Sequence, residues 1–505
     1  MRRPRSLIAA LLAVTLLIPA ATAGAAADPL SGWERSRLAP GVELYQGVIA
    51  GRPGADAWTV TVRQGGGHLG GQAETDALLA RLRAAGFEPE AQQVRWPDGS
   101  DRTGVIGSRV RVGRFGGQNQ AENQRTALTK AGFDAITEWT GADATPGTGI
   151  AQVKVAVIDP RQFRGSLGGS YGTAVAGRET VTAMAQGSLL AVNAGFFVME
   201  PVDGVPGAAA GIAAYRGKLQ SAATNGRIAA ILRGNGLRPE FAHLRTRSTV
   251  KAGADTETID GINRTPGVVR NCGGVGGDKP TERPQHDVTC TDPDEIVRYT
   301  AELGAPTSAG PGTEVTLDAT GTVLAVRDRG GDVPAGGSAL AGIGAGATWL
   351  RDHAVPGQRL VVEDRILDER DREIRLGAED DIVNGGPELV RDGRVAIDFA
   401  ADGIERIGDP SFAYTWGIKR NPRMVLGVDR AGRLLLVTTA GRQPGYSDGL
   451  GLGEVAKLVQ SLGAVRAMNL DGGGSVGMAV NGKMITMPSD ATGERAVGDA
   501  LLLRR

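Results

Sequence analysis

The sequence predicts an α+β fold, in which a small βαββαβ unit precedes a larger, strand-rich domain with a mixed sheet. The chain has 505 residues, of which 41% are hydrophobic, so it is long enough for about two to four domains. Two strand-and-helix patterns of similar sequence precede residue 141. Beyond that point strand-like runs dominate and helical patterns are few, and this segregation of helices from strands is typical of α+β proteins.

The first 27 residues have the features of an export signal. Arginine occupies three of the first five positions, and the apolar stretch Leu7–Ile18 that follows is too short to span a bilayer. Small residues ending at Ala27 suit a cleavage site. We expect residues 1–27 to be removed and the rest to be secreted or extracytoplasmic, without a membrane span. An uncleaved anchor is the alternative.

The βαββαβ unit is predicted from two similar halves. Trp58–Val62 alternates as a strand does, and Gly71–Gly86 has apolar residues at helical spacing. The second half repeats this order with the strand Ser108–Gly113 and the helix Gln120–Ala131. Both helices are followed by Gly-Phe, which favours an internal duplication.

This unit, residues 55–141, resembles the sporulation-related repeat (SPOR) domain, which has a ferredoxin-like fold. The resemblance rests on Val110–Phe115, on the helix that follows and on Ala131–Phe133. It implies that peptidoglycan is a binding partner and that the protein is associated with the cell wall. A plain ferredoxin-like module with a packing role is the alternative.

The larger domain is predicted to span 150–505, after a Gly-rich linker at Gly141–Gly149. One segment, Leu452–Leu462, has a clear apolar helical face. Runs typical of strands are Val153–Ile158, Leu189–Val192, Glu314–Leu317, Thr322–Val326, Leu360–Val362, Met424–Val428 and Leu434–Thr438.

The chain has two cysteines, Cys272 and Cys290. An even count in an exported protein favours a disulfide, which would stabilise the Gly-rich segment between them by roughly 3 kcal/mol. Two free thiols are the alternative. The pair lacks the CxxC spacing of a zinc site.

Several classes of function are disfavoured by what the chain lacks. Its formal net charge of +0 is not that of a nucleic-acid binder. It has four histidines and neither HExxH nor GxxxxGK[ST]. GxSxG occurs around Ser170, Ser447 and Ser475, but no histidine follows the last two and no clear strand precedes the first. A hydrolase built on this chain would therefore use carboxylates. No metal or cofactor is expected, although acidic turns could hold structural Ca²⁺.

The strongest local motif is Asn-Leu-Asp-Gly-Gly-Gly-Ser, which runs from Asn469 to Ser475 after an apolar strand. Asn469 and Asp471 are two residues apart and so share a face. The glycines Gly472–Gly474 can present successive backbone N–H groups to an anion. A carboxylate beside such a turn suits a phosphorylated sugar, whereas a Gly-rich hairpin turn is the plainer interpretation.

Other polar turns follow strands or precede helices, and arginine suits phosphate because its guanidinium donates parallel hydrogen bonds. Their candidate residues are Asn193, Gly195, Asn384, Glu388, Arg423, Glu454 and Arg495.

Taken in order, these turns resemble the phosphodiester glycosidase family from Val153 to the C-terminus. Asn193–Phe197 is similar to the family's Asn-Gly-Gly-Phe-Phe, and Asn469–Ser475 matches its Asn-Leu-Asp-Gly-Gly-Gly-Ser in full. Pro422-Arg423 with Gly427, Glu454 and Arg495-x-Val497 match further motifs.

Three residues depart from the family pattern. Ala194 replaces a glycine, and Met424 stands where a threonine is frequent. Asp499 stands near a frequent asparagine, which would alter the charge of the site.

The resemblance implies an exported hydrolase that cleaves the sugar C1–O bond of sugar-1-phosphodiesters in cell-wall or capsular phosphoglycans, without a cofactor. It implies Asp471, then Glu454, as catalytic carboxylates. It implies that Arg423, Arg495, Ser475 and Gly472–Gly474 contact phosphate, and that Asn193 and Asn469 contact sugar hydroxyls; Gly195, Asn384 and Glu388 complete the substrate-binding set. A non-catalytic wall-glycan binder on the same fold, and a phosphodiesterase that cuts P–O, are the alternatives.

Overall fold

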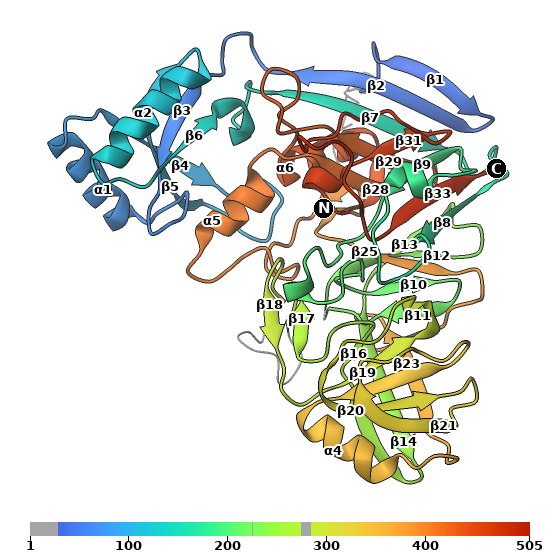
Figure 1. The fold of residues 1–505 in the computed structure, drawn as a ribbon. Coiled ribbons are helices and arrows are strands. Elements are labelled where there is room, and N and C mark those ends of the chain that lie inside the picture. The colour runs from blue at the N-terminus through green and yellow to red at the C-terminus, as the bar shows by residue number, and fades with distance from the viewer. Residues whose placement is uncertain (1–28, 225, 274–283) are drawn as a thin grey trace, which may run out of the picture.

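A computed structural model describes residues 29–224, 226–273 and 284–505 (Figure 1). The predicted signal peptide therefore lies outside the described residues. None of the helices in these three stretches is long and apolar enough to cross a membrane.

An eight-stranded sheet forms the centre of the larger domain, with every neighbouring pair antiparallel. Its order is β1-β2-β7-β29-β28-β30-β26-β27. The strands are β1 (Glu34–Ala39), β2 (Val42–Ala50), β7 (Ile150–Ile158), β26 (Glu388–Arg391), β27 (Arg394–Val395), β28 (Arg423–Asp429), β29 (Leu434–Thr439) and β30 (Ala464–Asn469).

The central strands of this sheet are covered on both faces, which explains their unbroken apolar sequence. Along β28, Met424 and Leu426 enter one core cluster and Val425 enters another. Helix α6 (Leu452–Ser461) covers the second face with Val455 and Val459. The predicted strand and helix in this region are thus present, and the alternation of side chains joins the sheet to two cores.

A five-stranded sheet of order β32-β31-β9-β33-β8 supplies the other side of the first core. Its strands are β8 (Ser166–Ser170), β9 (Leu190–Asn193), β31 (Met478–Val480), β32 (Lys483–Met484) and β33 (Ala500–Arg504). A further sheet of order β11-β10-β25-β12-β13 comprises β10 (Ala213–Tyr215), β11 (Lys218–Ser221), β12 (Ile228–Leu232), β13 (Glu240–His243) and β25 (Asp381–Asn384).

The chain between β13 and β25 forms a lower lobe (Figure 1). One sheet contains β14 (Arg245–Ala252), β15 (Asp255–Ile259), β23 (Val361–Leu367) and β24 (Glu373–Ile374). The other contains β16 (Gly261–Ile262), β19 (Ile296–Thr300), β20 (Gly310–Leu317), β21 (Val323–Arg329) and β22 (Ser338–Gly342). It is mixed because β16 pairs with β19 in parallel. Helix α4 (Gly344–His353) packs on it, and a hairpin of β17 (Val268–Arg270) and β18 (Thr289–Thr291) leaves the lobe.

The N-terminal unit has the βαββαβ order that the sequence predicts. Its elements are β3 (Trp58–Val62), α1 (Gln72–Ala84), β4 (Pro89–Arg95), β5 (Val105–Phe115), α2 (Gln118–Lys130) and β6 (Ala135–Trp139). The strands form one antiparallel sheet of order β4-β5-β3-β6. The resemblance to a SPOR domain stays a prediction.

This unit is inserted between two paired strands, and that corrects the predicted boundary at residue 150. β2 pairs with β7 along its whole length, so β1 and β2 belong to the central sheet of the larger domain. The predicted linker at 141–149 is also ordered. It begins in the short helix η1 (Thr140–Asp143), and buried Asp143 forms an ion pair with Arg111.

Short helices complete the fold. They are α3 (Val181–Met184), η2 (Pro201–Asp203), η3 (Ala301–Leu303), α5 (Pro410–Ala413), the π-helical turn η4 (Tyr414–Ile418) and η5 (Gly473–Ser475).

Candidate active site

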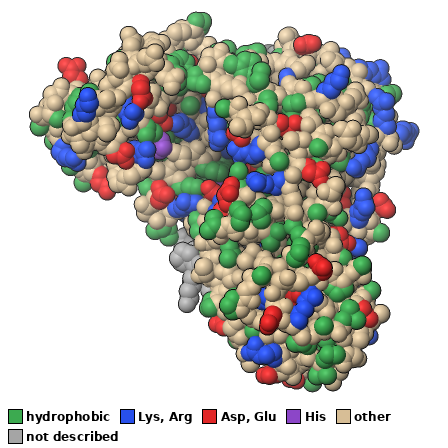
Figure 2. All heavy atoms as spheres, in the orientation of Figure 1, with side chains coloured by type: hydrophobic (Ala, Val, Ile, Leu, Met, Phe, Trp, Pro, Cys, Tyr) green, Lys and Arg blue, Asp and Glu red, His purple; other side chains and the backbone are tan. Residues whose placement is uncertain are grey.

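A cavity of about 400 Å³ opens at one edge of the central sheet. The antiparallel register places the start of β28 and the ends of β29 and β30 at this edge. Loops after these strands, η4 and the β17–β18 hairpin enclose it. In Figure 2, Lys and Arg side chains gather around the hollow between the N-terminal unit and the lower lobe. The lining residues are Phe196, Phe197, Met199, Arg270, Asn271, His286, Asp287, Phe412, Thr415, Trp416, Asn421, Arg423, Arg442, Asp471, Gly472, Gly473, Gly474 and Arg495.

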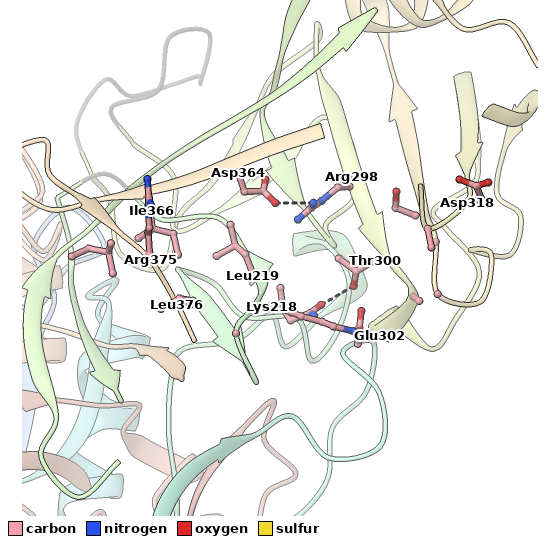
Figure 3. A pocket seen from close by; sticks show the side chains of 18 of the residues that line it. Lys218, Leu219, Arg298, Thr300, Glu302, Asp318, Asp364, Ile366, Arg375 and Leu376 are labelled. Atoms are coloured by element: carbon pink, nitrogen blue, oxygen red, sulfur yellow. Dashed lines mark hydrogen bonds and ion pairs between the residues drawn. The ribbon is translucent and has the colours of Figure 1, made fainter. Parts of the chain in front are cut away.

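A larger hollow of about 630 Å³ lies between the β10–β11 hairpin and the lower lobe (Figure 3). Its cations are neutralised: Arg298 pairs with Asp364 at 2.7 Å and Lys218 pairs with Glu302 at 2.7 Å. It also contains none of the motif residues that the sequence singles out. The smaller cavity is therefore the better candidate for a reaction site.

Asp471 is the carboxylate that the motif brings to the cavity. It follows β30, and its backbone N–H donates to the carbonyl of Ala194 at 2.9 Å. Burial raises the pKa of Asp471 to about 6, and the negative charge of Asp499 adds to this. Hydrogen bonds from Ser475 and from the Gly472 N–H, and the charge of Arg495, act in the opposite direction. A pKa of about 6 lies within the range that suits a general acid or base near neutral pH.

The three glycines after Asp471 allow two arginines to lie against the backbone. A Cβ at Gly474 would overlap the guanidinium of Arg495, and one at Gly473 would lie 3.0 Å from Nη2 of Arg442. Gly473 also has a φ of +60°, where side chains are disfavoured. The guanidinium groups of Arg442 and Arg495 therefore pack directly against the backbone of the Gly-rich turn.

Two of the arginines in the cavity lack a carboxylate partner. Arg423 donates to the carbonyls of Leu450 and Trp416 at 3.0 and 2.6 Å, and Arg442 donates to Oδ1 of Asn421 at 3.1 Å. Neither forms an ion pair with any residue that the structure describes.

Burial makes the charged forms of Arg423 and Arg442 less favourable. Burial, with Arg442 nearby, lowers the pKa of Arg423 to about 9. Burial and the charge of Arg495 lower the pKa of Arg442. Buried cations without partners favour an anionic ligand. Arg495 differs, because Asp490 accepts from its Nε at 2.7 Å.

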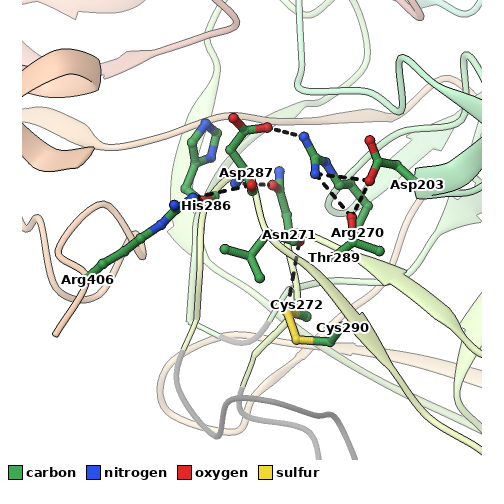
Figure 4. Close-up of a disulfide and its surroundings, with 10 residues drawn as sticks. Asp203, Arg270, Asn271, Cys272, His286, Asp287, Thr289, Cys290 and Arg406 are labelled. Atoms are coloured by element: carbon green, nitrogen blue, oxygen red, sulfur yellow. Dashed lines mark hydrogen bonds and ion pairs between the residues drawn. A yellow bond between two sulfur atoms is a disulfide. The ribbon is translucent and has the colours of Figure 1, made fainter. Parts of the chain in front are cut away.

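The opposite wall is aromatic and includes His286, Phe196, Phe412 and Trp416. His286 lies on the segment that the Cys272–Cys290 disulfide closes (Figure 4). The predicted disulfide is present, with the Cα atoms 5.8 Å apart. Most of the Gly-rich segment between the cysteines, residues 274–283, lies outside the described residues.

The predicted asparagines are close to the cavity but form its scaffold. Asn193 donates to the carbonyl of Asp471 at 2.8 Å and accepts from the Gly477 N–H at 3.1 Å. Asn469 is buried and donates to the carbonyl of Gly386 at 2.9 Å. Because neither side chain lines the cavity, the expected contacts with sugar hydroxyls are not supported by the geometry.

Asn384 and Gly195 act in the same indirect way. The Oδ1 atom of Asn384 accepts from the Phe196 N–H at 2.9 Å and so holds an aromatic wall residue. Gly195 is required because a Cβ there would lie 2.5 Å from Nδ2 of Asn384. Asp499, the departure from the family pattern, accepts from the Gly195 N–H at 2.8 Å and from the Tyr215 hydroxyl at 2.7 Å. Its burial raises its pKa to about 6.

Two predicted carboxylates lie outside the cavity. Glu454 caps helix α6, accepting from the Gly451 N–H at 2.9 Å, and pairs with Arg420 at 2.7 Å. Glu388 is buried in ion pairs with Arg391 and Arg466. Both carboxylates therefore already have arginine partners. Neither side chain lines the cavity, so the catalytic role of Glu454 and the substrate contact of Glu388 stay predictions to which this geometry adds no support.

Six of the candidate residues line the cavity, namely Arg423, Asp471, Gly472, Gly473, Gly474 and Arg495. Ser475 bonds to Asp471, and the roles of all seven stay predictions. The set of candidate residues predicted from the sequence does not include His286, Trp416, Phe196 or Arg442. The available signal for Arg442 was its place directly after a strand, as for Asp471. In the part of the chain that the structure describes, no three His, Cys, Asp or Glu side chains could hold a metal ion.

A family model and a relative of known activity match parts of the chain. Residues 307–504 match the family model described as phosphodiester glycosidase. A segment of 68 residues is 40% identical to N-acetylglucosamine-1-phosphodiester alpha-N-acetylglucosaminidase of Mus musculus. This match spans 14% of the chain and 13% of the mouse protein.

Two solved structures are similar over nearly the whole chain. The "Putative exported protein" of Burkholderia pseudomallei K96243 is 32% identical with a TM-score of 0.82, over 94% of this chain and 96% of that one. A hypothetical protein from Synechocystis is 18% identical with a TM-score of 0.53, over 94% of this chain and 76% of that one, which shows the fold alone. The family model covers the C-terminal region that holds Arg423, Asp471 and Arg495, so residues 307–504 form a phosphodiester glycosidase domain.

Proposed function

We propose that this protein hydrolyses the C1–O bond of sugar-1-phosphodiesters, releasing the sugar and a phosphomonoester. The observation that carries the proposal is the pairing, in one cavity, of a carboxyl with a pKa of about 6, Asp471, and two arginines without carboxylate partners. A phosphodiester supplies the anion that Arg423 and Arg442 lack. The sugar carbon beside it supplies the electrophile for a carboxylate.

The leaving group in this reaction is a phosphate, which needs little protonation. The C1–O electron pair passes to the phosphate oxygen as the bond breaks. Arg423, Arg442 and Arg495 are placed to stabilise the negative charge that develops there, together with N–H groups of the Gly472–Gly474 turn. Removal of one such donor typically lowers kcat by about 10²–10³-fold.

Asp471 acts on the side of the sugar. As a base it takes a proton from the water that attacks C1, and the product sugar then has inverted configuration. As a nucleophile it forms a glycosyl ester that water hydrolyses, and configuration is retained. In both cases the ionised carboxylate is the active form, so the anomer released identifies which chemistry Asp471 performs.

The substrate is proposed to be an extracytoplasmic phosphoglycan of the cell wall or capsule. The signal-like N-terminus, the Cys272–Cys290 disulfide and the description of the Burkholderia protein support export. On the resemblance of the N-terminal unit to a SPOR domain, that unit is proposed to hold the enzyme at peptidoglycan. The solvent-facing side of that unit is where such binding is to be sought.

The test is phosphorus NMR of purified residues 28–505 with methyl-phospho-α-N-acetylglucosamine in ¹⁸O-labelled water. Methyl phosphate without ¹⁸O, whose phosphorus signal shows no isotope shift, supports C–O cleavage. Label in the phosphate shows P–O cleavage and overturns the mechanism. Failure to turn over this compound, teichoic acids and capsular polymers, together with tight binding of them, would favour the alternative of a non-catalytic wall-glycan binder.

A further inference from the structure

The aromatic wall of the cavity is a cup centred on His286. The centre of its ring lies 4.5 Å from that of Phe196, 4.3 Å from that of Trp416 and 6.3 Å from that of Phe412. The planes are tilted by 63°, 64° and 43° respectively. Rings inclined in this way form a concave apolar surface and leave no pair of parallel faces between which a flat ligand could lie.

His286 is only 6% exposed, yet within the described ranges its ring nitrogens have no hydrogen-bond partner. Burial lowers its pKa well below the usual range, and the charge of Arg227 adds to this. The imidazole is therefore neutral and carries one donor and one acceptor. Because His286 lines the cavity, its ring nitrogens can bond to a ligand that enters there.

Backbone hydrogen bonds hold His286 in place, so its ring has a defined position in the cavity. Its N–H donates to the carbonyl of Gly403 at 2.9 Å, and its own carbonyl accepts from Nη2 of Arg406 at 2.7 Å. The next residue, Asp287, donates its N–H to Oδ1 of Asn271 at 2.7 Å. Figure 4 shows Arg406, Asn271 and Asp287 beside His286 and the disulfide.

We propose that this cup is the subsite for the sugar ring of the substrate, with His286 as a specificity-determining residue. The assignment rests on the proposed function and adds an orientation to it. The C–H face of the sugar packs on Trp416 and Phe196, a hydroxyl bonds to His286, and the phosphate points to Arg423 and Arg442. A neutral, concave, partly polar surface suits a puckered polyhydroxylated ring. The cationic end of the cavity suits the phosphate.

The test is binding of three probes, N-acetylglucosamine, inorganic phosphate and uridine, measured by calorimetry on the full chain. The variant is His286→Phe, which keeps a ring and removes its nitrogens. The matched control is His353→Phe on helix α4, where the imidazole stacks on Trp349 at 4.5 Å, far from the cavity. We expect His286→Phe to weaken N-acetylglucosamine about tenfold, with phosphate affinity unchanged and the control equal to the wild type.

Other outcomes overturn the assignment. Unchanged affinity of His286→Phe for N-acetylglucosamine, or an equal loss for sugar and phosphate, removes His286 from a sugar subsite. A loss for uridine alone assigns the cup to an aromatic aglycone instead.

Binding needs no turnover, so these results are independent of the hydrolysis test. Sugar binding that depends on His286 in a protein without hydrolysis would keep the subsite and reject the proposed reaction. With turnover, KM should rise in His286→Phe while kcat is unchanged, whereas a merely structural role would lower kcat and the Tm together.

Discussion

Replacing Asp471 by asparagine should abolish turnover and at the same time stabilise the protein at neutral pH. Burial and neighbouring charge raise the pKa of this carboxyl from 3.8 to about 6. That change makes its ionised form about 3 kcal/mol less favourable in the folded chain than in the unfolded one. Because the side chain is partly exposed to water in the cavity, the expected gain from Asp471→Asn is smaller, about 1–2 kcal/mol at pH 7.5.

The sign of this effect depends on pH. A carboxyl whose pKa is raised by folding destabilises the folded state above that pKa, and the penalty disappears as pH falls. The difference between Asp471→Asn and wild type should therefore shrink from pH 7.5 and vanish below about pH 4. Urea unfolding followed by circular dichroism at both pH values measures it, with exposed Asp352→Asn on helix α4 as the control.

Activity gives the second half of this prediction. If ionised Asp471 is the active form, kcat/KM should fall about tenfold per pH unit below about pH 6. A flat profile between pH 5 and 7 would refute the role of Asp471. Lower stability of Asp471→Asn at pH 7.5 would refute the electrostatic reasoning itself, because it would mean that the charge is stabilised by its surroundings.

Four further changes test other parts of the site. Arg442→Gln should lower kcat/KM by about 10²-fold and weaken inhibition by inorganic phosphate, since one uncompensated cation is lost; steady-state kinetics with unchanged inhibition would contradict this. Asp499→Asn should shift the acid limb of the pH–rate profile downward by roughly half a unit, because the Asp499 charge raises the pKa of Asp471. Cys272→Ser should lower the free energy of unfolding by about 3 kcal/mol, and reductant should bring wild type to the same urea midpoint but leave the variant unaffected. Glu454→Gln should cost about 1 kcal/mol through the weakened cap of α6 yet keep full turnover; loss of turnover without loss of fold would support Glu454 as a catalytic carboxylate.

Patterns within short stretches of sequence predict the buried strands and the amphipathic helix, because burial of one or both faces determines which residues are apolar. The run Met424–Val428 is apolar throughout because both of its faces are buried, and Leu452–Leu462 has one apolar face because it covers a sheet. The pairing of β2 with β7 joins residues about a hundred positions apart and has no local signature. The turn η4 was not predicted because a single π-helical turn has no repeating pattern.

The same distinction applies to the site. Asp471 and the glycines after it form a contiguous motif, so their proximity could be inferred from sequence. His286 reaches the cavity only through the hairpin and the ring contact with Trp416, neither of which a sequence displays. Glu454 has a structural role that the sequence does signal, because three residues after Gly451 at the start of a helix is the position of a capping residue; its catalytic role stays a prediction.

The inserted N-terminal unit contacts the segment that carries Trp416, although it is separate from that segment in the sequence. Its two ends meet, with the Gly51 N–H donating to the carbonyl of Gly149 at 2.7 Å, so a short turn could replace it without disturbing the strands on either side. Yet Leu69 donates its N–H to the Ser411 hydroxyl at 3.0 Å, and Arg109 donates to the Tyr414 hydroxyl at 2.8 Å. These contacts hold the segment that carries Trp416. A module that is dispensable for chain connectivity thus supports the aromatic side of the cavity, so its removal should disturb Trp416 although the chain on either side of it could still be joined.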